Sequence, residues 1–184
     1  MKQIIAILFL GLAFTGCNEK IEKSKEGVAL GKHYFDFDEV MYYNIKILDS
    51  TVYRAADRDF KLRKNNTRPV KDSLISTIMI GYAPSKLTDT TFETNMKRIG
   101  FTSKKIDKSK LAALNEIFRE RKYDDYTFNA CLNVYRDILV FKRQSKTVGV
   151  AKICFGCAGL VLVGADDSTG EFMEYAELHK LLKE

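Results

Sequence analysis

An apolar run of eleven residues, 4–14, lies close to the start of the 184-residue chain and limits what the remainder can fold into. A helix needs about 20 apolar residues to cross a bilayer, so this run is too short to span one. Its length, with Lys2 before it and small residues after it, is typical of the hydrophobic region of a secretory signal. We therefore expect residues 1–16 to be a signal peptide that takes no part in the fold.

Cys17 follows this run directly after the small residues Thr15 and Gly16. The arrangement resembles the lipobox of bacterial lipoproteins, with Phe14 at the position where that family usually has leucine. The resemblance implies cleavage before Cys17 and acylation of that residue by chains such as palmitate. Each buried CH₂ contributes about 0.8 kcal/mol, so several chains give a stable membrane anchor. The protein would then lie in the bacterial cell envelope, facing the periplasm or the exterior, with the choice of membrane left open.

The next residues have a composition that cannot support a hydrophobic core. Residues 18–27 are almost wholly polar, carry charges of both signs and include one large apolar side chain. Such a segment is expected to be extended, so we predict that residues 17–30 form the lipidated cysteine and a polar tether. Residues 31–184 are enough for one globular domain with a proper core.

The first half of this domain predicts an alternation of strands and irregular segments. Aromatic and β-branched residues predict a strand within 34–47, and residues 74–82 predict a second, central strand. The polar and basic stretch 49–72 contains turn signals and predicts a long loop or irregular hairpin. Residues 88–100 predict a short helix that ends at Gly100.

The second half gives stronger local signals. Asp107 is a candidate N-cap for a helix, with Ile106 and Leu111 as a hydrophobic staple and with Arg119, Arg121 and Lys122 in the last turn. Later segments predict, in order, a hairpin (135–142 with 147–155), a strand (160–163), a turn (165–170) and an amphipathic helix (171–183). Because no regular βαβ order is present, we expect a single α+β domain with a mainly antiparallel sheet and two or three helices.

Three cysteines remain if Cys17 is acylated: Cys131, Cys154 and Cys157. Exported chains meet an oxidising compartment, so a structural disulfide is the first expectation. Cys131 can pair with Cys154 or Cys157, or the bond can form within the CxxC, and one thiol is left over in each case.

Two functional alternatives use the same cysteines. A thiol–disulfide redox role would use Cys154 and Cys157, with Cys131 as partner, and Lys152 on the same strand face would favour a thiolate. The motif lies between two strand-like runs with no helix after it, which departs from the thioredoxin pattern. A zinc–thiolate site would add His33 or His179 as the fourth ligand.

The cysteine spacing itself carries a second resemblance. Residues 131–141, followed by residues 153–157, give a C-x22-CxxC pattern over about 30 residues. This pattern is similar to one in uncharacterised secreted or lipid-anchored bacterial proteins, and it implies no established activity.

Other polar groups are weaker candidates. Asp36 and Asp38 are two apart and, with Glu39, could bind a cation or act as an acid–base pair, but a solvated strand face is the favoured explanation. The run 166–170 has acidic and hydroxyl groups but lacks the ligand ladder of a calcium loop. His33 and His179 are the histidines available as general bases, and no known catalytic motif accompanies them.

The net charge of +6 is unevenly distributed. Residues 54–72 carry seven Lys or Arg against three Asp, and residues 97–122 carry nine against three acids. An exported protein meets anionic lipid headgroups, acidic glycans or other envelope proteins rather than nucleic acid, although a solvated helix face is the favoured explanation for residues 97–122. We therefore expect a non-enzymatic binding or structural domain that is tethered to a membrane and needs no cofactor, with the thiol redox or zinc–thiolate protein as the alternative.

Overall fold

The computed structural model describes residues 28–65, 67–123, 131–165, 172 and 174–183. The predicted signal peptide, Cys17 and nearly all of the tether lie outside these residues, as does the predicted turn after residue 165. The tether was expected to extend to residue 30, but the first strand, β1 (Val28–His33), already begins at Val28.

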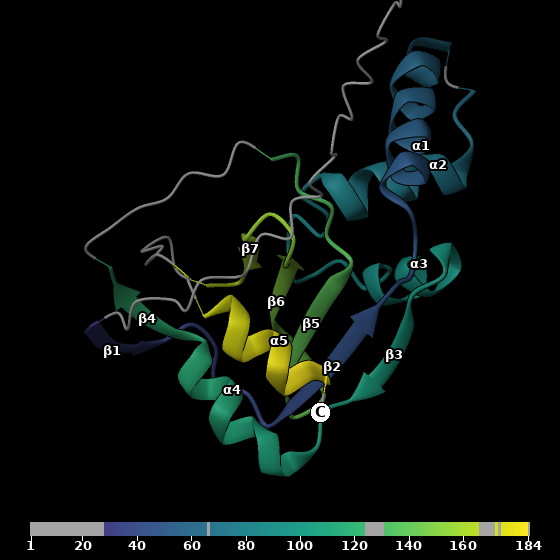
Figure 1. Cartoon of the computed structure of the whole chain (residues 1–184). Helices are drawn as coiled ribbons and strands as arrows, with labels where there is room; N and C mark the ends of the chain where they lie inside the picture. The colour runs from purple at the N-terminus through teal and green to yellow at the C-terminus, as the bar shows by residue number, and fades with distance from the viewer. Residues whose placement is uncertain (1–27, 66, 124–130, 166–171, 173, 184) are drawn as a thin grey trace, which may run out of the picture.

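A five-stranded antiparallel sheet forms the centre of the fold (Figure 1), with strand order β3-β2-β5-β6-β7. Its strands are β2 (Glu39–Asn44), β3 (Thr102–Lys105), β5 (Asp137–Arg143), β6 (Lys146–Cys154) and β7 (Gly159–Val163). The antiparallel pairing and the mixture with helices confirm the expected α+β class.

The helices lie on the two faces of this sheet, and β1 pairs separately with β4 (Arg119–Lys122). Residues of α1 (Asp49–Leu62), α2 (Val70–Ile75) and α3 (Phe92–Ile99) share one hydrophobic cluster. Residues of α4 (Leu111–Ile117) and α5 (Tyr175–Lys183) share the other. The described residues thus hold five α-helices, more than the two or three expected from the sequence.

Side-chain alternation along the strands divides the core into these two layers. On β5, Ile138 and Val140 pack with the α1–α3 layer, whereas Leu139 and Phe141 pack with α4 and α5. All four side chains are fully buried. The central strands are therefore covered on both faces, which explains why their sequences are continuously apolar.

Two predictions for the first half were wrong. The stretch 49–72, expected as a loop, forms α1, a 3₁₀ turn η1 (Arg63–Asn65) and the start of α2. The stretch 74–82, expected as a central strand, contains the end of α2 and a π-helix η2 (Ser76–Ile80). Val52, Ala55 and Asp59 are buried at helical spacing on α1, and the charge of Asp59 hides this apolar face from a hydropathy pattern.

Two further predictions were correct only in part. Within the expected strand 34–47, the structure limits β2 to Glu39–Asn44, and Phe35 is buried in an irregular connection. Asp107 caps a 3₁₀ turn, η3 (Lys108–Lys110), that leads directly into α4, and it does so by accepting a hydrogen bond of 2.8 Å from the Ser109 amide. The basic residues expected in the last turn of that helix instead lie on β4, because α4 ends at Ile117.

The remaining elements were predicted correctly in kind. Gly100 ends α3 in a left-handed conformation, with φ of 112°. The hairpin of β5 and β6, strand β7 and the C-terminal helix α5 all follow the expected order.

Candidate functional site

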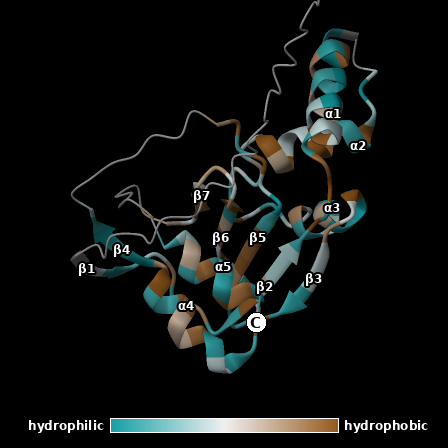
Figure 2. Cartoon of the chain, in the orientation of Figure 1, coloured by the Kyte–Doolittle hydropathy of each residue, from teal (hydrophilic) through white to brown (hydrophobic). Residues whose placement is uncertain are grey.

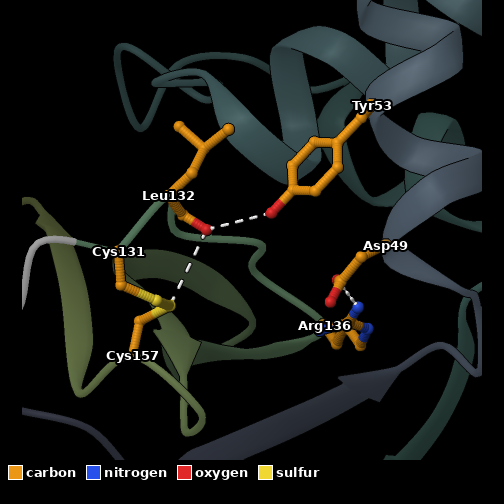
Figure 3. Close-up of a disulfide and its surroundings, with 6 residues drawn as sticks. All are labelled: Asp49, Tyr53, Cys131, Leu132, Arg136 and Cys157. Carbon is orange, nitrogen blue, oxygen red and sulfur yellow. Dashed lines mark hydrogen bonds and ion pairs between the residues drawn. A yellow bond between two sulfur atoms is a disulfide. The ribbon is translucent and has the colours of Figure 1, made fainter.

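A disulfide joins Cys131 to Cys157, with the two Cα atoms 5.7 Å apart. It ties the segment before β5 to the turn between β6 and β7 (Figure 3). The carbonyl of the neighbouring Leu132 accepts a hydrogen bond of 3.4 Å from the Tyr53 hydroxyl on α1. The disulfide and this hydrogen bond therefore connect α1 with the turn between β6 and β7 through the segment that contains Cys131 and Leu132.

Arg136 continues the same connection along the chain. Its Nε donates a hydrogen bond of 3.1 Å to the carbonyl of Ile47, and its guanidinium pairs with Asp49 in the first turn of α1 (Figure 3). An acidic residue in the first turn is also stabilised by the helix dipole. The segment between the disulfide and β5 is thus held to the start of α1 by contacts at several points.

Among the cysteines that the structure describes, Cys154 is the free thiol, and it is buried at the end of β6. The amide of Cys157 donates a hydrogen bond of 3.3 Å to the Cys154 carbonyl, which closes a turn over the CxxC. Of the pairings left open by the sequence, the structure contains Cys131–Cys157. No helix begins after the motif, so the CxxC lacks the helix N-terminus that usually lowers a thiol pKa.

Lys152 lies two residues before Cys154, and its side chain is fully buried. Its ammonium donates a hydrogen bond to the carbonyl of Gly81 and lies 4.7 Å from the centre of the Tyr135 ring. No carboxylate among the described residues pairs with it. Burial lowers the pKa of Lys152 to about 7, because a low-polarity surrounding disfavours the charged form.

Tyr135 and Asn133 also belong to the group of polar side chains around Lys152. Burial raises the pKa of the Tyr135 hydroxyl, and the nearby Cys154 acts in the same direction, while a hydrogen bond with Asn133 acts against it. The Asn133 side-chain oxygen is buried and has no hydrogen-bond partner among the described residues. Sequence reasoning singled out Lys152 and Cys154 but missed Tyr135 and Asn133, which are distant from them in the chain.

A second candidate site is a pocket of about 350 Å³ beside α4. His33 is one of its lining residues, and His33 Nδ1 lies 3.0 Å from the carbonyl oxygen of Asn115. Because a carbonyl can only accept a hydrogen bond, this contact places the hydrogen of a neutral imidazole on Nδ1 and leaves Nε2 as an acceptor. The other lining residues are Phe35, Asp36, Phe37, Leu111, Ala112 and Asn115.

The three acids considered for cation binding have separate partners. Asp36 forms an ion pair with Arg143, and Glu39 forms one with Lys105. Asp38 accepts hydrogen bonds of 3.0 and 3.3 Å from the Gln144 amide. Across the described residues, no group of three or more His, Cys, Asp or Glu side chains is placed to hold a metal ion.

His179, the other histidine considered as a general base, packs against an aromatic ring. Its ring meets the ring of Phe155 edge-on, with 4.8 Å between centres. The acidic run 166–170 lies outside the described residues. The structure therefore brings His33 and Asp36 to one pocket, whereas it places His179 in packing between α5 and the β6–β7 turn.

The second basic segment, 97–122, serves the fold in several places. Lys104 and Lys110 donate hydrogen bonds of 3.2 and 3.0 Å to the carbonyls of Leu182 and Leu181, at the C-terminal end of α5. Arg121 lies 3.1 Å from the Glu174 carboxylate. These three of the nine cations complement the end of a helix dipole and a nearly buried acid, so local structure explains part of the charge of this segment.

Comparison with protein families, with curated proteins and with solved structures found no match to this chain. No helix within the described ranges is long and apolar enough to cross a membrane.

Proposed function

We propose that the chain is a cell-envelope lipoprotein, anchored through Cys17, whose folded domain binds a partner at the membrane without catalysing a reaction. The observation that carries this proposal is the N-terminal pattern: an apolar run of eleven residues, two small residues and then Cys17, followed by a polar segment. This pattern resembles the signal and lipobox of bacterial lipoproteins.

The disulfide supports the same compartment. Disulfides persist in secreted and periplasmic proteins and are rare in the cytosol, where thiols are kept reduced. The Cys131–Cys157 bond ties two segments of the domain together. It does not involve Cys17, the proposed site of acylation. A membrane anchor at one end and a disulfide-stabilised domain at the other are compatible with exposure to the envelope.

Mass spectrometry of the protein purified from its native envelope tests the anchor. We expect the N-terminal residue to be Cys17 and to carry a diacylglycerol and an acyl chain. In the Cys17→Ser variant, the acyl mass should disappear, and the protein should leave the membrane fraction after a high-salt wash that screens electrostatic surface binding. An uncleaved N-terminus, or an unmodified Cys17, would contradict the proposal.

A thiol-exchange role is the second candidate, and the free Cys154 favours it. The Cys154 thiolate would attack the sulfur of Cys157, form a Cys154–Cys157 bond and release Cys131 as a thiolate. The proton lost by Cys154 is taken up by Cys131, so the exchange needs no external oxidant. The hydrogen-bonded turn between Cys154 and Cys157 supports their proximity.

Peptide mapping after alkylation tests this exchange. We expect the Cys131→Ser variant, prepared under oxidising conditions, to contain a Cys154–Cys157 bond. Two free thiols in that variant would contradict the exchange. The zinc version needs the Cys131–Cys157 bond to be reduced, because zinc binds thiolates, and a purified protein without bound zinc would contradict it.

A further inference from the structure

Helix α1 extends away from the sheet, and its C-terminal end lies far from the core (Figure 1). Figure 2 shows hydrophobic positions set among hydrophilic ones along α1 and α2. The last part of α1 contains Phe60, whose side chain is 72% exposed. This residue is not needed for packing within the chain, because Val52 and Ala55 form the buried face of the helix.

Cations surround Phe60 in the sequence and at the helix end. Lys61, Arg63 and Lys64 follow it, and all three are exposed. A helix C-terminus by itself favours cations, so these charges alone need no ligand. The helix dipole gives no reason, however, for a large aromatic side chain to remain in water among them.

The acids of this segment are already paired with its own cations. Asp72 accepts two hydrogen bonds from Arg58, at 2.7 and 2.9 Å. The fully buried Asp59 lies between Arg63 and Arg68, at 3.4 and 3.6 Å. With Asp57 paired to Lys61 at 2.7 Å, each of the three carboxylates of this segment is balanced by a cation of the same segment, and residues 54–72 keep a net charge of +4.

We infer that the outer end of α1 and the adjoining η1 turn, defined by Phe60, Lys61, Arg63 and Lys64, contact the surface of an anionic lipid bilayer. The cations would be attracted to the headgroups, and the Phe60 ring would enter the boundary with the acyl chains. Each basic residue near such a surface contributes about 1 kcal/mol, and burial of an aromatic ring adds to it. The inference names the partner of the proposed binding domain and rests on that function for its biological setting.

The exposed apolar residues at the other end of α1 provide a matched comparison. Leu48 is also 72% exposed, and it precedes the first turn of the same helix. Tyr53 and Leu132 are exposed large side chains near this inner end, and the Tyr53 hydroxyl donates a hydrogen bond to the Leu132 carbonyl. Phe60 and Leu48 thus have equal exposure on one helix but different surroundings.

The chain contains no tryptophan, so a single introduced indole reports on one place only. The protein to use is the chain from residue 17 onward with Cys17→Ser, which retains every described residue and cannot be acylated. Two variants are made in this background, Phe60→Trp and Leu48→Trp. Each is titrated with vesicles of phosphatidylcholine alone and with vesicles containing phosphatidylglycerol.

We expect the emission of Phe60→Trp to shift to shorter wavelength with anionic vesicles, and that of Leu48→Trp to remain unchanged. Binding should weaken steeply when salt is raised, because surface charges are screened. Phe60→Ala should lower the vesicle partition coefficient by roughly tenfold, which corresponds to the loss of one buried aromatic side chain. Neutral vesicles should give little binding.

Other outcomes would overturn the inference. Vesicle binding with an unshifted Phe60→Trp spectrum would place the contact elsewhere, and no binding to anionic vesicles would remove it. A shift with an acidic polysaccharide but not with vesicles would assign the surface to a glycan. None of these results bears on acylation of Cys17, so the anchor and this surface are tested separately.

Discussion

The buried ammonium of Lys152 on β6 donates a hydrogen bond to the carbonyl of Gly81, 71 residues away in the sequence. Gly81 follows the last turn of η2, where the helix end carries a partial negative charge that favours a cation. The contact fastens the end of η2 to the sheet. It also removes a charged group from water, which disfavours the protonated form.

This contact predicts a stability that increases with pH above neutrality. Burial lowers the pKa of Lys152 to about 7, whereas a lysine in an unfolded chain has a pKa of about 10.4. Between these values the unfolded chain binds more protons than the folded one, so the free energy of unfolding rises with pH. Relative to Lys152→Met, the wild type should gain about 1–3 kcal/mol between pH 7 and pH 9, measured by urea unfolding.

The comparison needs a control on the same strand. Lys146→Met removes an exposed lysine from β6 and should leave the pH trend of the wild type in place. A constant difference between the wild type and Lys152→Met over this range would mean that the fold stabilises the ammonium as well as water does.

Glu93 on α3 predicts a pH dependence of the same sign at acid pH, where stability falls as the pH falls. It accepts a hydrogen bond from Tyr43 and pairs with Lys142 at 2.7 Å. Burial opposes its ionisation, but the hydrogen bonds from Lys142 and Tyr43 outweigh burial and hold the pKa of Glu93 below its usual value. Such a carboxylate stabilises the fold above its unfolded-state pKa and loses this contribution as the pH falls. Glu93→Gln should lower the free energy of unfolding by about 1–2 kcal/mol at pH 7.

The pH dependence of this variant separates charge from packing. The difference between the wild type and Glu93→Gln should shrink between pH 7 and pH 3, as the pH falls through the lowered pKa of Glu93 in the folded state. Glu177→Gln on α5 removes an exposed acid and serves as the control. An effect of Glu93→Gln that is equal at both pH values would assign it to lost packing.

The two halves of the domain differ in how well the sequence predicts them. The strands β5 and β6 are apolar, are joined by a short turn and pair with each other along the chain. The hydropathy pattern alone therefore identifies this hairpin. In α1, by contrast, the buried face includes Asp59, which is compensated by Arg63 and Arg68. A hydropathy pattern indicates only a charged segment there, since the pairing of Asp59 with these cations is known only from the structure.

The prediction of a strand that includes residues 76–80 was wrong for a related reason. Their β-branched side chains favour a strand locally, but burial of Ile78 and Met79 against the α1–α3 layer selects a helix. At the candidate sites, the sequence identified the cysteines but not which two of them pair, because three thiols allow three alternative pairings. The contact of His33 with Asn115 joins residues 82 apart, and no local signal indicates it.

Close packing of Asn133 against Gly159 predicts a sensitive position at the start of β7. A Cβ added at Gly159 would overlap the Asn133 side chain, whereas one added at Gly156 would meet no atom within 4 Å. Gly159→Ala should therefore destabilise the fold by about 1–3 kcal/mol, while Gly156→Ala in the same turn should have little effect. Denaturant unfolding measures both, and equal effects would contradict the packing argument.

A double variant then locates the clash. Combined with Asn133→Ala, which removes the overlapping amide, Gly159→Ala should cost less than it does alone. Additive effects of the two substitutions would mean that Gly159 is needed for its backbone rather than for the space it leaves.

The Cys131–Cys157 bond predicts a stability that depends on redox conditions. It closes a loop across a sequence separation of 26 residues, so its loss should lower the free energy of unfolding by about 2–4 kcal/mol. The double variant Cys131→Ser with Cys157→Ser should resemble the reduced wild type and should not respond to reductant. Cys154→Ala is the control, because a free thiol outside the bond should leave the response to reductant intact. If Cys154→Ala abolishes that response instead, then Cys154 belongs to the bond that stabilises the protein, and exchange with Cys157 has replaced the pairing with Cys131.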